Sequence, residues 1–409
     1  MSGGGTGRLA RRSCDIFCRV VDNFGDIGFC WRLAGGLAHE HALAVRLWID
    51  DLTTFARIEP SVSTELDQQG VAGIDVRRWR EPLAALQFDA VAEIVVQGFG
   101  SPLPQAYLEA MQRATPAPVW IDLEYLSAEK WIDEFHGRPS PLGGRHLVKH
   151  FFFPGFTPAS GGLLRERGLL ERRRAFCADT ELQRRWWSDV GLPAPSVGER
   201  RLSLFCYPNP AALPLLSSLA EDAGARWTVL VPEGTLGGDL DQFAPGLVGR
   251  AGKVGKVGKV GDVGKVRASR TIGSLTLYVM PFLPQDEYDR LLWACDVNFV
   301  RGEDSFVRAQ WAGRPFIWQI YPQEGGVHLE KLDAFLARYT DGWPVAASTR
   351  LHALWRAWNT PEGDIGAVWR AFWAAAPLWQ DPVARWPEAL SRQSDLASRL
   401  AHLASDLLN

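Results

Sequence analysis

The chain has 409 residues, which is long for one domain and favours two. Its apolar fraction of 46% and charged fraction of 22% are typical of a soluble globular protein, and its net charge of −3 argues against a general nucleic-acid binder. The polar first dozen residues do not resemble a signal peptide, no window approaches the roughly 18 apolar residues of a membrane span, and six cysteines without a C-x-x-C pair favour a reducing compartment. We therefore expect a cytoplasmic protein that binds neither nucleic acid nor a membrane.

The first part of the chain alternates short apolar runs with helical patterns. This alternation predicts a parallel sheet with helices on both faces. The residues that follow each strand then meet at the carboxyl edge of the sheet, where open α/β sheets bind ligands. The expected strands are 16–21, 44–49, 74–79, 92–96 and 118–122, and the clearest helices are 29–40 and 104–113.

A second alternating series follows a bridge at 165–195 that carries charge, Gly and Pro around a helical middle. It predicts a second doubly wound sheet. The remaining segment, 328–409, has helical patterns broken at 342–344, 361–363 and Pro382, and its many tryptophans favour a helix-packing core over ligand stacking. The expected strands of the second sheet are 202–207, 227–231, 275–280, 297–301 and 315–320, with helices at 210–220, 284–294 and 303–312.

Repeated Gly-Lys-Val units occupy 252–266. Their high Gly content and lack of hydrophobic periodicity predict a flexible surface insert at 251–267. Contact of these lysines with an acidic partner is the alternative, and the composition favours the solvated loop.

The stretch 22–28, Asp-Asn-Phe-Gly-Asp-Ile-Gly, joins the first strand to the first helix. Its glycines allow a sharp turn and a close approach to a ligand. The two carboxylates, Asp22 and Asp26, do not suit packing, because Asp is rarely buried unpaired. In the alternative interpretation Asp26 caps the helix and Asp22 is solvated. The local pattern leaves both open.

A similar strand–glycine–helix junction lies at 301–305. The N–H groups and dipole at a helix start favour an anion, and Arg301 adds a bidentate phosphate donor. Ser305 could bond a phosphate oxygen or cap the helix, and Glu303 suits sugar hydroxyls. The combination favours a nucleotide-sugar diphosphate, with an ordinary capped helix as the alternative.

Aromatic residues follow the strands of the second series. A site that binds a pyrimidine base needs aromatic rings that stack on the base, and an amide such as that of Gln285 that bonds its edge. No zinc spacing, P-loop, dinucleotide fingerprint or nucleophile elbow is present, and an Asp-x-Asp pair at 239–241 favours a chance match over a divalent-metal site. The aromatic set is Phe205, Tyr207, Phe282, Tyr288 and Tyr321.

From about Cys14 to its end the chain resembles the protein-arginine rhamnosyltransferases of elongation factor P, the EarP family. The N-terminal dozen residues and the Gly-Lys-Val insert depart from the family pattern, and neither touches a motif. The motifs that carry the resemblance are Val21-Asp22-Asn23-Phe24-Gly25-Asp26-Ile27-Gly28, Cys30-Trp31-Arg32-Leu33-Ala34, Leu123-Glu124-Tyr125-Leu126-Ser127 and Gly302-Glu303-Asp304-Ser305-Phe306-Val307-Arg308-Ala309-Gln310.

The resemblance implies an α/β protein of GT-B architecture, with two Rossmann-like domains facing a cleft. The acceptor domain would span 1–185, completed by C-terminal helices at 375–409, and the nucleotide-sugar domain would span 190–374. The donor would be dTDP-β-L-rhamnose and the acceptor a loop arginine of elongation factor P, which is thereby activated to rescue ribosomes stalled at polyproline. Transfer would invert the anomeric configuration and need neither a metal nor a cofactor.

The resemblance also assigns site residues. It makes Asp26 the catalytic carboxylate and implies that Asp22 and Glu303 are needed for activity. Asn23, Phe24 and Gly25 are expected to contact substrate. The implied donor pocket consists of Phe205, Tyr207, Phe282, Gln285, Tyr288, Arg301, Asp304, Ser305 and Tyr321.

The chemistry agrees with these assignments. A guanidinium stays charged and its nitrogen lone pairs are delocalised, so it must be held in line with the anomeric carbon by carboxylates. The departing diphosphate needs donors such as Arg301. The rival hypotheses are another GT-B enzyme acting on a cell-surface glycan and a non-catalytic sugar-nucleotide-binding module, and the intact acidic residues argue against the module. The enzymatic interpretation requires Asp26 and Ser305 to share one cavity.

Overall fold

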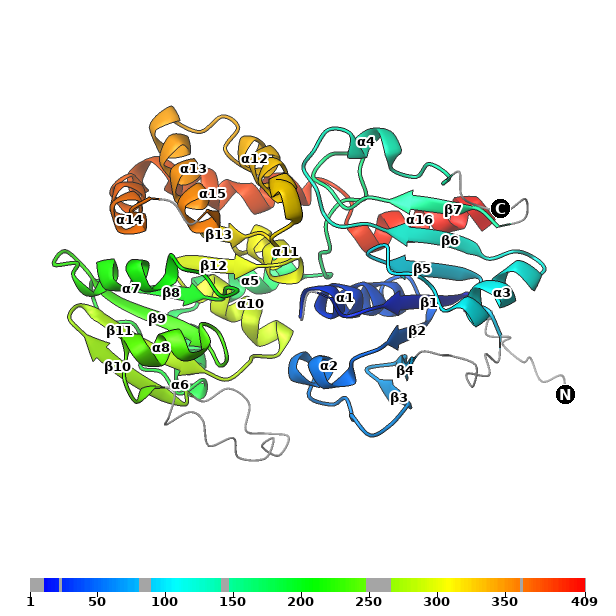
Figure 1. The fold of residues 1–409 in the computed structure, drawn as a ribbon, viewed down its shortest axis with the longest axis horizontal. Helices are drawn as coiled ribbons and strands as arrows, with labels where there is room; N and C mark the ends of the chain where they lie inside the picture. The colour runs from blue at the N-terminus through cyan, green and yellow to red at the C-terminus, as the bar shows by residue number, and fades with distance from the viewer. Residues whose placement is uncertain are drawn as a thin grey trace, which may run out of the picture.

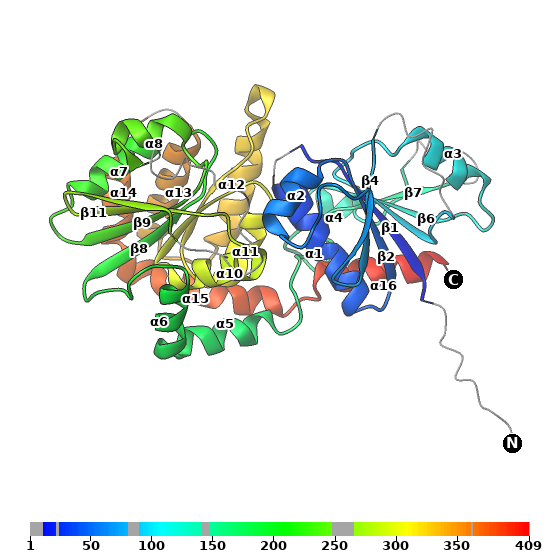
Figure 2. The same ribbon diagram turned by 90° about the horizontal axis from the view of Figure 1, so that it is seen from below.

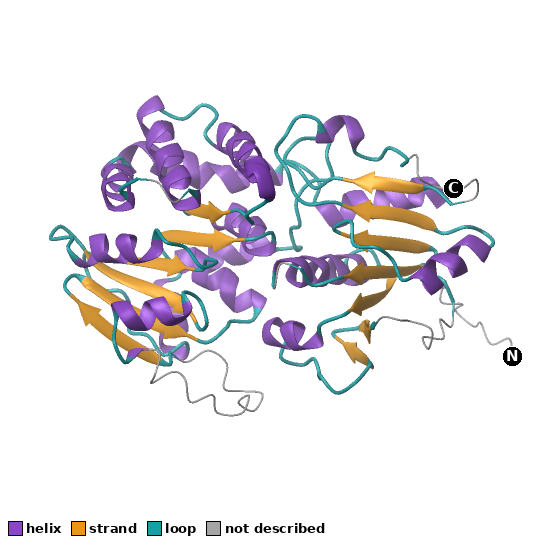
Figure 3. Cartoon of the chain, viewed as in Figure 1, coloured by secondary structure: helices purple, strands orange, loops and turns teal. Residues whose placement is uncertain are grey.

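The computed structural model describes residues 11–21, 24–80, 90–140, 147–247, 266–360 and 363–408. These residues form two α/β halves that lie side by side, each around its own sheet (Figure 1). Helices pack against both sets of strands (Figure 3). In this part of the chain no helix combines the length and apolar character needed to cross a membrane.

The first sheet has seven strands in the order β3-β4-β2-β1-β5-β6-β7. All neighbours run parallel except β3, which is antiparallel to β4. The central strand β1 is buried, and its Ile16 lies between Leu47 of β2 and Val96 of β5. The strands are β1 (Ser13–Cys18), β2 (Ala44–Ile49), β3 (Gln68–Val71), β4 (Ile74–Arg78), β5 (Ile94–Gly98), β6 (Val119–Leu123) and β7 (Lys149–Phe152).

The second sheet has six strands in the order β10-β11-β9-β8-β12-β13, again parallel apart from one edge strand, β10. Its central strands are apolar and buried, as parallel strands covered on both faces should be. They are β8 (Glu199–Leu204), β9 (Arg226–Pro232), β10 (Ala268–Ile272), β11 (Leu275–Met280), β12 (Val297–Arg301) and β13 (Phe316–Gln319).

The helices of the first half are α1 (Gly25–His39), α2 (Leu52–Ile58), α3 (Gln105–Arg113) and α4 (Ile132–Phe135). Those that follow are α5 (Leu169–Ala178), α6 (Thr180–Asp189), α7 (Ala212–Ala220), α8 (Gly237–Phe243), α10 (Gln285–Ala294), α11 (Asp304–Ala312), the short η1 (Glu324–Gly326), α12 (Val327–Tyr339), α13 (Val345–Asn359), α14 (Ile365–Ala374), α15 (Ala376–Ser391) and α16 (Leu396–Leu408).

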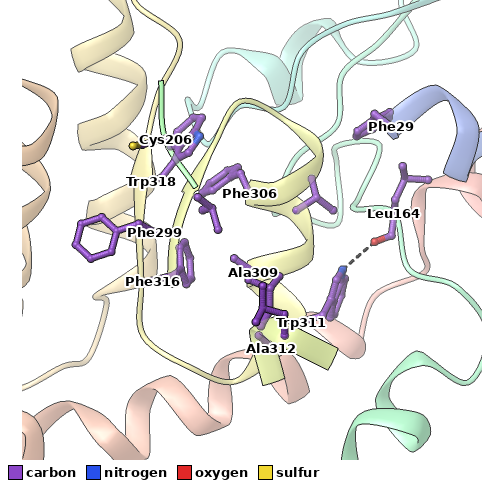
Figure 4. Packing of buried hydrophobic residues seen from close by; sticks show 14 of the residues in the cluster. Phe29, Leu164, Cys206, Phe299, Phe306, Ala309, Trp311, Ala312, Phe316 and Trp318 are labelled. Carbon is purple, nitrogen blue, oxygen red and sulfur yellow. Dashed lines mark hydrogen bonds between the residues drawn. The ribbon is translucent and has the colours of Figure 1, made fainter. Parts of the chain in front are cut away.

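Helix α11 is the best-buried helix of the second half and lies where the two halves meet. Every residue of this helix is buried, and the ring of Phe306 stacks on Trp318 with 3.9 Å between centroids. Trp311 Nε1 donates to the carbonyl of Leu164 in the segment that joins the halves, at 2.8 Å (Figure 4). Helix α11 is therefore fixed along its length by buried contacts.

The predicted tryptophan core is confirmed for four buried side chains, Trp355, Trp358, Trp369 and Trp379. The predicted break at Pro382 is wrong, since α15 runs through it and through a second proline. A proline inside a helix costs about 3 kcal/mol. The buried face of α15, which includes Trp379, packs against α11, α13 and α14 and offsets that cost.

The chain returns to the first half through its last helix. Helix α16 packs against α1 and β6, whereas α15 packs on helices of the second half. Figure 2 shows these two helices along one side of the molecule. Leu396 N donates to the carbonyl of Leu163 at 2.9 Å, and the Arg399 guanidinium donates to the carbonyl of Pro158 at 2.7 Å. The two segments that join the halves are thus bonded to each other.

Of the predicted insert at 251–267, residues 251–265 lie outside the described residues. The last two residues of the predicted insert, Val266 and Arg267, do not fit a flexible loop. Val266 N donates to Val190 O at 3.0 Å, and Arg267 N donates to Val279 O at 2.8 Å, so the backbone here already leads into β10.

Candidate active site

A pocket lies between the two halves of the molecule. Phe24 and Gly25 at the start of α1 form one side, and Arg301 and Ser305, at the end of β12 and the start of α11, form another. The two Gly-containing motifs therefore border one cavity. The remaining lining residues are Ile58, Phe205, Pro232, Met280, Pro281, Phe282, Leu283, Gln285, Tyr288, Leu291, Asp304 and Arg308.

Aromatic side chains form much of the pocket wall. Phe24 of the first half contacts Phe282 of the second, with 4.1 Å between ring centroids, and Phe205 lies 5.8 Å from the same ring. Rings spaced in this way are attracted beyond the area that they bury. Phe24 thus closes one end of the pocket across the boundary between the halves.

Arg301 lies between two rings. Its guanidinium carbon is 4.5 Å from the ring centroid of Phe205 and 4.4 Å from that of Tyr207. These cation–π contacts fix a positive charge at the strand end. Tyr321 packs edge-on against Tyr207 at 5.7 Å and is 47% exposed. Of the predicted donor residues, Tyr207 and Tyr321 do not line the pocket directly.

Asp26 is fully buried, with 0% of its surface exposed. It lies in the first turn of α1, which begins four residues earlier than predicted, and the N-cap position is taken by Phe24. One carboxylate oxygen accepts from Val21 N at 2.8 Å and the other from the Tyr125 hydroxyl at 3.4 Å. The helix-capping interpretation of Asp26 is therefore wrong. The predicted residues Asp22 and Asn23 lie outside the described residues.

The junction before α11 is not an ordinary capped helix either. Its N-cap residue, Glu303, makes no side-chain cap bond and is 6% exposed. Ser305 bonds back to the strand instead: its hydroxyl accepts from Arg301 N at 3.0 Å and donates to the carbonyl of the same residue. Gly302 turns the chain with φ of +60°, a conformation that glycine adopts without strain.

Asp304 occupies the centre of a buried ionic cluster. One carboxylate oxygen accepts from Arg32 of α1 at 3.0 Å, and the other accepts from Arg308 at 3.0 Å and from the Gln285 amide at 3.1 Å. Charge-assisted bonds of this kind are roughly twice as strong as neutral ones. Asp304 thereby ties both halves together in the wall of the pocket.

Two further carboxylates complete the ionic cluster, and their pKa values move in opposite directions. Burial raises the pKa of Asp289 to about 6, although Arg308 lies 2.9 Å away. Burial also acts on Glu166, but Arg32, at 2.6 Å, outweighs it and lowers the pKa of that carboxyl to about 2. The five charges, two arginines and three carboxylates, leave the cluster acidic.

At Gly28, helix α1 lies close to Asp304 of α11 and to Gln285 of α10. A Cβ atom there would lie 2.8 Å from Asp304 Oδ2 and 3.1 Å from the Gln285 amide nitrogen, which also donates to the Gly28 carbonyl. The glycine of the first motif thus permits contact between the halves.

We expect Gly28→Ala to lower turnover at this site at least about tenfold, because the methyl group must displace a buried, ion-paired carboxylate. The check is turnover together with the thermal unfolding midpoint. Gly35→Ala on the same helix is the matched control, since a Cβ there meets nothing within 4 Å. Equal effects of the two substitutions would show that helix propensity, and not the contact between halves, decides the result.

The family model described as Elongation-Factor P (EF-P) rhamnosyltransferase EarP matches residues 14–405. The chain belongs to this family. A protein-arginine rhamnosyltransferase from Pseudomonas aeruginosa is 46% identical over 396 residues, which cover 97% of this chain and 100% of the relative.

Two solved structures support the fold. One, described as the structural basis for EarP-mediated arginine glycosylation of translation elongation factor EF-P, superposes with a TM-score of 0.64 at 36% identity and covers 97% of this chain and 99% of its own. MurG of Acinetobacter baumannii superposes with a TM-score of 0.51 at 10% identity, covering 97% and 100%. The predicted GT-B architecture and the predicted family are confirmed.

The sequence motifs of this EarP-family chain contain residues to which the sequence interpretation gave no role. Arg32 and Arg308 stand within two of the motifs and are buried in the ionic cluster. Each is a lone arginine in an apolar stretch of predicted helix, and a buried arginine needs a partner. The sequence could therefore have indicated both. Glu166 and Asp289, the partners, carry no such signal, because only the fold brings them close.

Proposed function

We propose that this chain transfers L-rhamnose from dTDP-β-L-rhamnose to an arginine side chain of elongation factor P, with inversion at the anomeric carbon. Family membership supports the activity, and a sugar-nucleotide donor follows from it. The observation that carries the proposal is the single pocket bordered by the Phe24–Gly25 turn and by the Arg301–Ser305 junction.

The donor would lie against the second half. Phe205, Phe282 and Tyr288 offer ring faces to a thymine base, and Tyr207 and Tyr321 extend that aromatic surface beyond the pocket. The diphosphate would lie at the start of α11, where backbone N–H groups and the helix dipole favour an anion. Arg301, fixed between its two rings, would offset the charge that develops on the leaving group, so we propose transfer without a metal.

The acceptor guanidinium would enter from the first half. Asp26 is the proposed catalytic carboxylate, which orients the guanidinium or accepts its proton as the new C–N bond forms. Glu303 approaches from the second half, and Asp22 remains a proposed partner. A direct, in-line displacement needs no enzyme nucleophile, which agrees with this set of side chains.

These roles divide the chain. We propose that residues 1–185, completed by the C-terminal helices at 375–409, form the acceptor domain. Of these helices α16 packs on α1 and β6, whereas α15 packs on helices of the second half. Residues 190–374, with the second sheet, would form the donor domain. The cleft between them would hold both substrates.

Intact-mass spectrometry tests the proposal. Elongation factor P is incubated with dTDP-β-L-rhamnose and the protein, and we expect a gain of one deoxyhexose residue that disappears when the acceptor arginine is changed to Lys. An unchanged mass would remove the proposal and favour a GT-B enzyme acting on a cell-surface glycan, or a module that only binds sugar nucleotides.

Ser305→Ala should weaken dTDP binding about fivefold. The hydroxyl bonds both backbone groups of Arg301, so its loss frees the strand end that carries the phosphate-binding guanidinium, at about 1 kcal/mol. Isothermal titration calorimetry measures the dissociation constant, with Ser188→Ala, at an exposed position of α6, as the control. Unchanged dTDP affinity in Ser305→Ala would refute this role.

A further inference from the structure

A lysine on α12 lies between the carboxylates of the two halves. Lys331 Nζ is 3.7 Å from Glu303 Oε1 and 5.6 Å from the ring centroid of Tyr125. Tyr125, in the loop after β6, donates its hydroxyl to Asp26 at 3.4 Å. A chain of contacts therefore runs from Asp26 of the first half, through a phenol and an ammonium, to Glu303 of the second.

A cation in this region stabilises buried carboxylates. Asp26 and Glu303 are 0% and 6% exposed, and burial of a carboxylate without a nearby positive charge is costly. Glu124 is close enough that Lys331 acts on its pKa, which burial and Asp122 nevertheless raise. Lys331 therefore supplies a positive charge to two carboxylates, Glu303 and Glu124.

The Tyr125 ring is held by aromatic packing, and Lys331 is largely buried. The ring of Tyr125 stacks on Phe99, 4.6 Å between centroids at an interplanar angle of 19°, and Phe99 in turn packs edge-on against Phe29 of α1. Lys331 is followed on α12 by the fully buried Leu332 and its own side chain is 20% exposed. Side chains fixed in this way can define the position of a partner.

We propose that Lys331 and Tyr125 are positioning residues of this active site. Tyr125 orients the carboxylate of Asp26, and Lys331 holds that of Glu303 and keeps the two halves in register at the acceptor end of the cleft. This inference rests on the proposed function and deepens it, because it gives a role to the Leu123–Ser127 motif. A purely structural ion pair would stabilise the fold without affecting turnover.

The test compares Lys331→Met, which removes the charge at similar volume, with Lys331→Arg, which keeps it. We expect Lys331→Met to lower kcat for rhamnosyl transfer at least about tenfold, with the dTDP dissociation constant within about twofold of the original. Loss of the charge beside a buried carboxylate should lower the thermal midpoint as well, so kcat is measured at a temperature at which the variant is fully folded. Lys331→Arg should recover most of kcat. Lys130→Met, at an exposed lysine in the same region, is the matched control.

Tyr125→Phe tests the other contact, since it removes the hydroxyl bond to Asp26 and keeps the ring. In the double variant with Lys331→Met, kcat should fall by less than the product of the two single reductions, as expected of residues that act as a unit. The inference would be overturned if Lys331→Met kept wild-type turnover or lost dTDP affinity in parallel with kcat. It would also be overturned if unfolding of the variant accounted for the fall in kcat, or if the effects of the two substitutions on kcat were fully multiplicative. Inactivity of the unsubstituted protein would instead overturn the proposed function, and the inference with it.

Discussion

Asp26→Asn should abolish transfer to elongation factor P, with a fall in kcat of about 10²–10⁴-fold. The amide keeps the size of the side chain, and its oxygen can still accept from Val21 N, but the negative charge that orients the guanidinium is lost. Donor binding should stay near normal, because the proposed diphosphate site lies on the other half, at Arg301 and Ser305. Turnover by intact mass and dTDP affinity by calorimetry are the two measurements.

Asp51→Asn is the matched control for this prediction. Asp51 also stands at a helix start of the first half, where it accepts from the backbone N–H groups of Thr53 and Thr54, and Asn caps helices equally well. We expect its turnover to be unchanged. Full turnover in Asp26→Asn would show that another group acts on the guanidinium, and equal loss of dTDP affinity would move Asp26 to the donor site.

Arg308→Met should destabilise the protein by about 3–5 kcal/mol, the usual result of leaving buried carboxylates without their partner. The Arg308 side chain is 2% exposed and bonds Asp289 at 2.9 Å and Asp304 at 3.0 Å. The urea midpoint of unfolding measures the loss. Arg290→Met is the control, because that arginine forms an exposed pair with Glu287, of a kind worth about 0–1 kcal/mol.

The loss of stability caused by Arg308→Met should grow as the pH rises. Burial already raises the pKa of Asp289 to about 6, and removal of the arginine should raise it further. A carboxyl with a raised folded-state pKa is protonated at low pH without cost, and it destabilises the fold once the pH exceeds its unfolded value near 4. The variant should therefore differ more from the original at pH 8 than at pH 5. Adding Asp289→Asn should recover part of the loss, and a loss independent of pH would point to packing alone.

The central strands could be predicted from the sequence because their apolar runs are unmistakable. The bounds of β11 and β12 agree with the prediction, whereas β3, β7 and β10 were missed. β3 and β10 are edge strands whose residues are largely exposed, so they carry no apolar run. The path of α15 through Pro382 was missed for the opposite reason, since packing against other helices outweighs the local signal.

The site could be predicted only as far as chain order fixes the carboxyl edges of the two sheets. Asp26 and Ser305 were expected to share a cavity. Ser305 lines the pocket together with Phe24 and Gly25, but the buried carboxylates Asp26 and Glu303 are not among its lining residues. The partners of Asp304 could not be foreseen, because Arg32 is 272 residues away in the sequence. The same holds for Lys331 and Tyr125, which meet only through the packing of the two halves.

The two bonded segments that join the halves have a mechanical consequence. Leu163 and Leu396 share a backbone hydrogen bond, and the Arg165 guanidinium donates to the carbonyls of Ser391 and Gln393, so the two crossings behave as one hinge. Rotation about that hinge would keep these bonds and would break those that cross the pocket, such as the bond from Arg32 to Asp304. It would separate Phe24 from Phe282, which would let nucleotide products leave while α16 stays clamped to the first half.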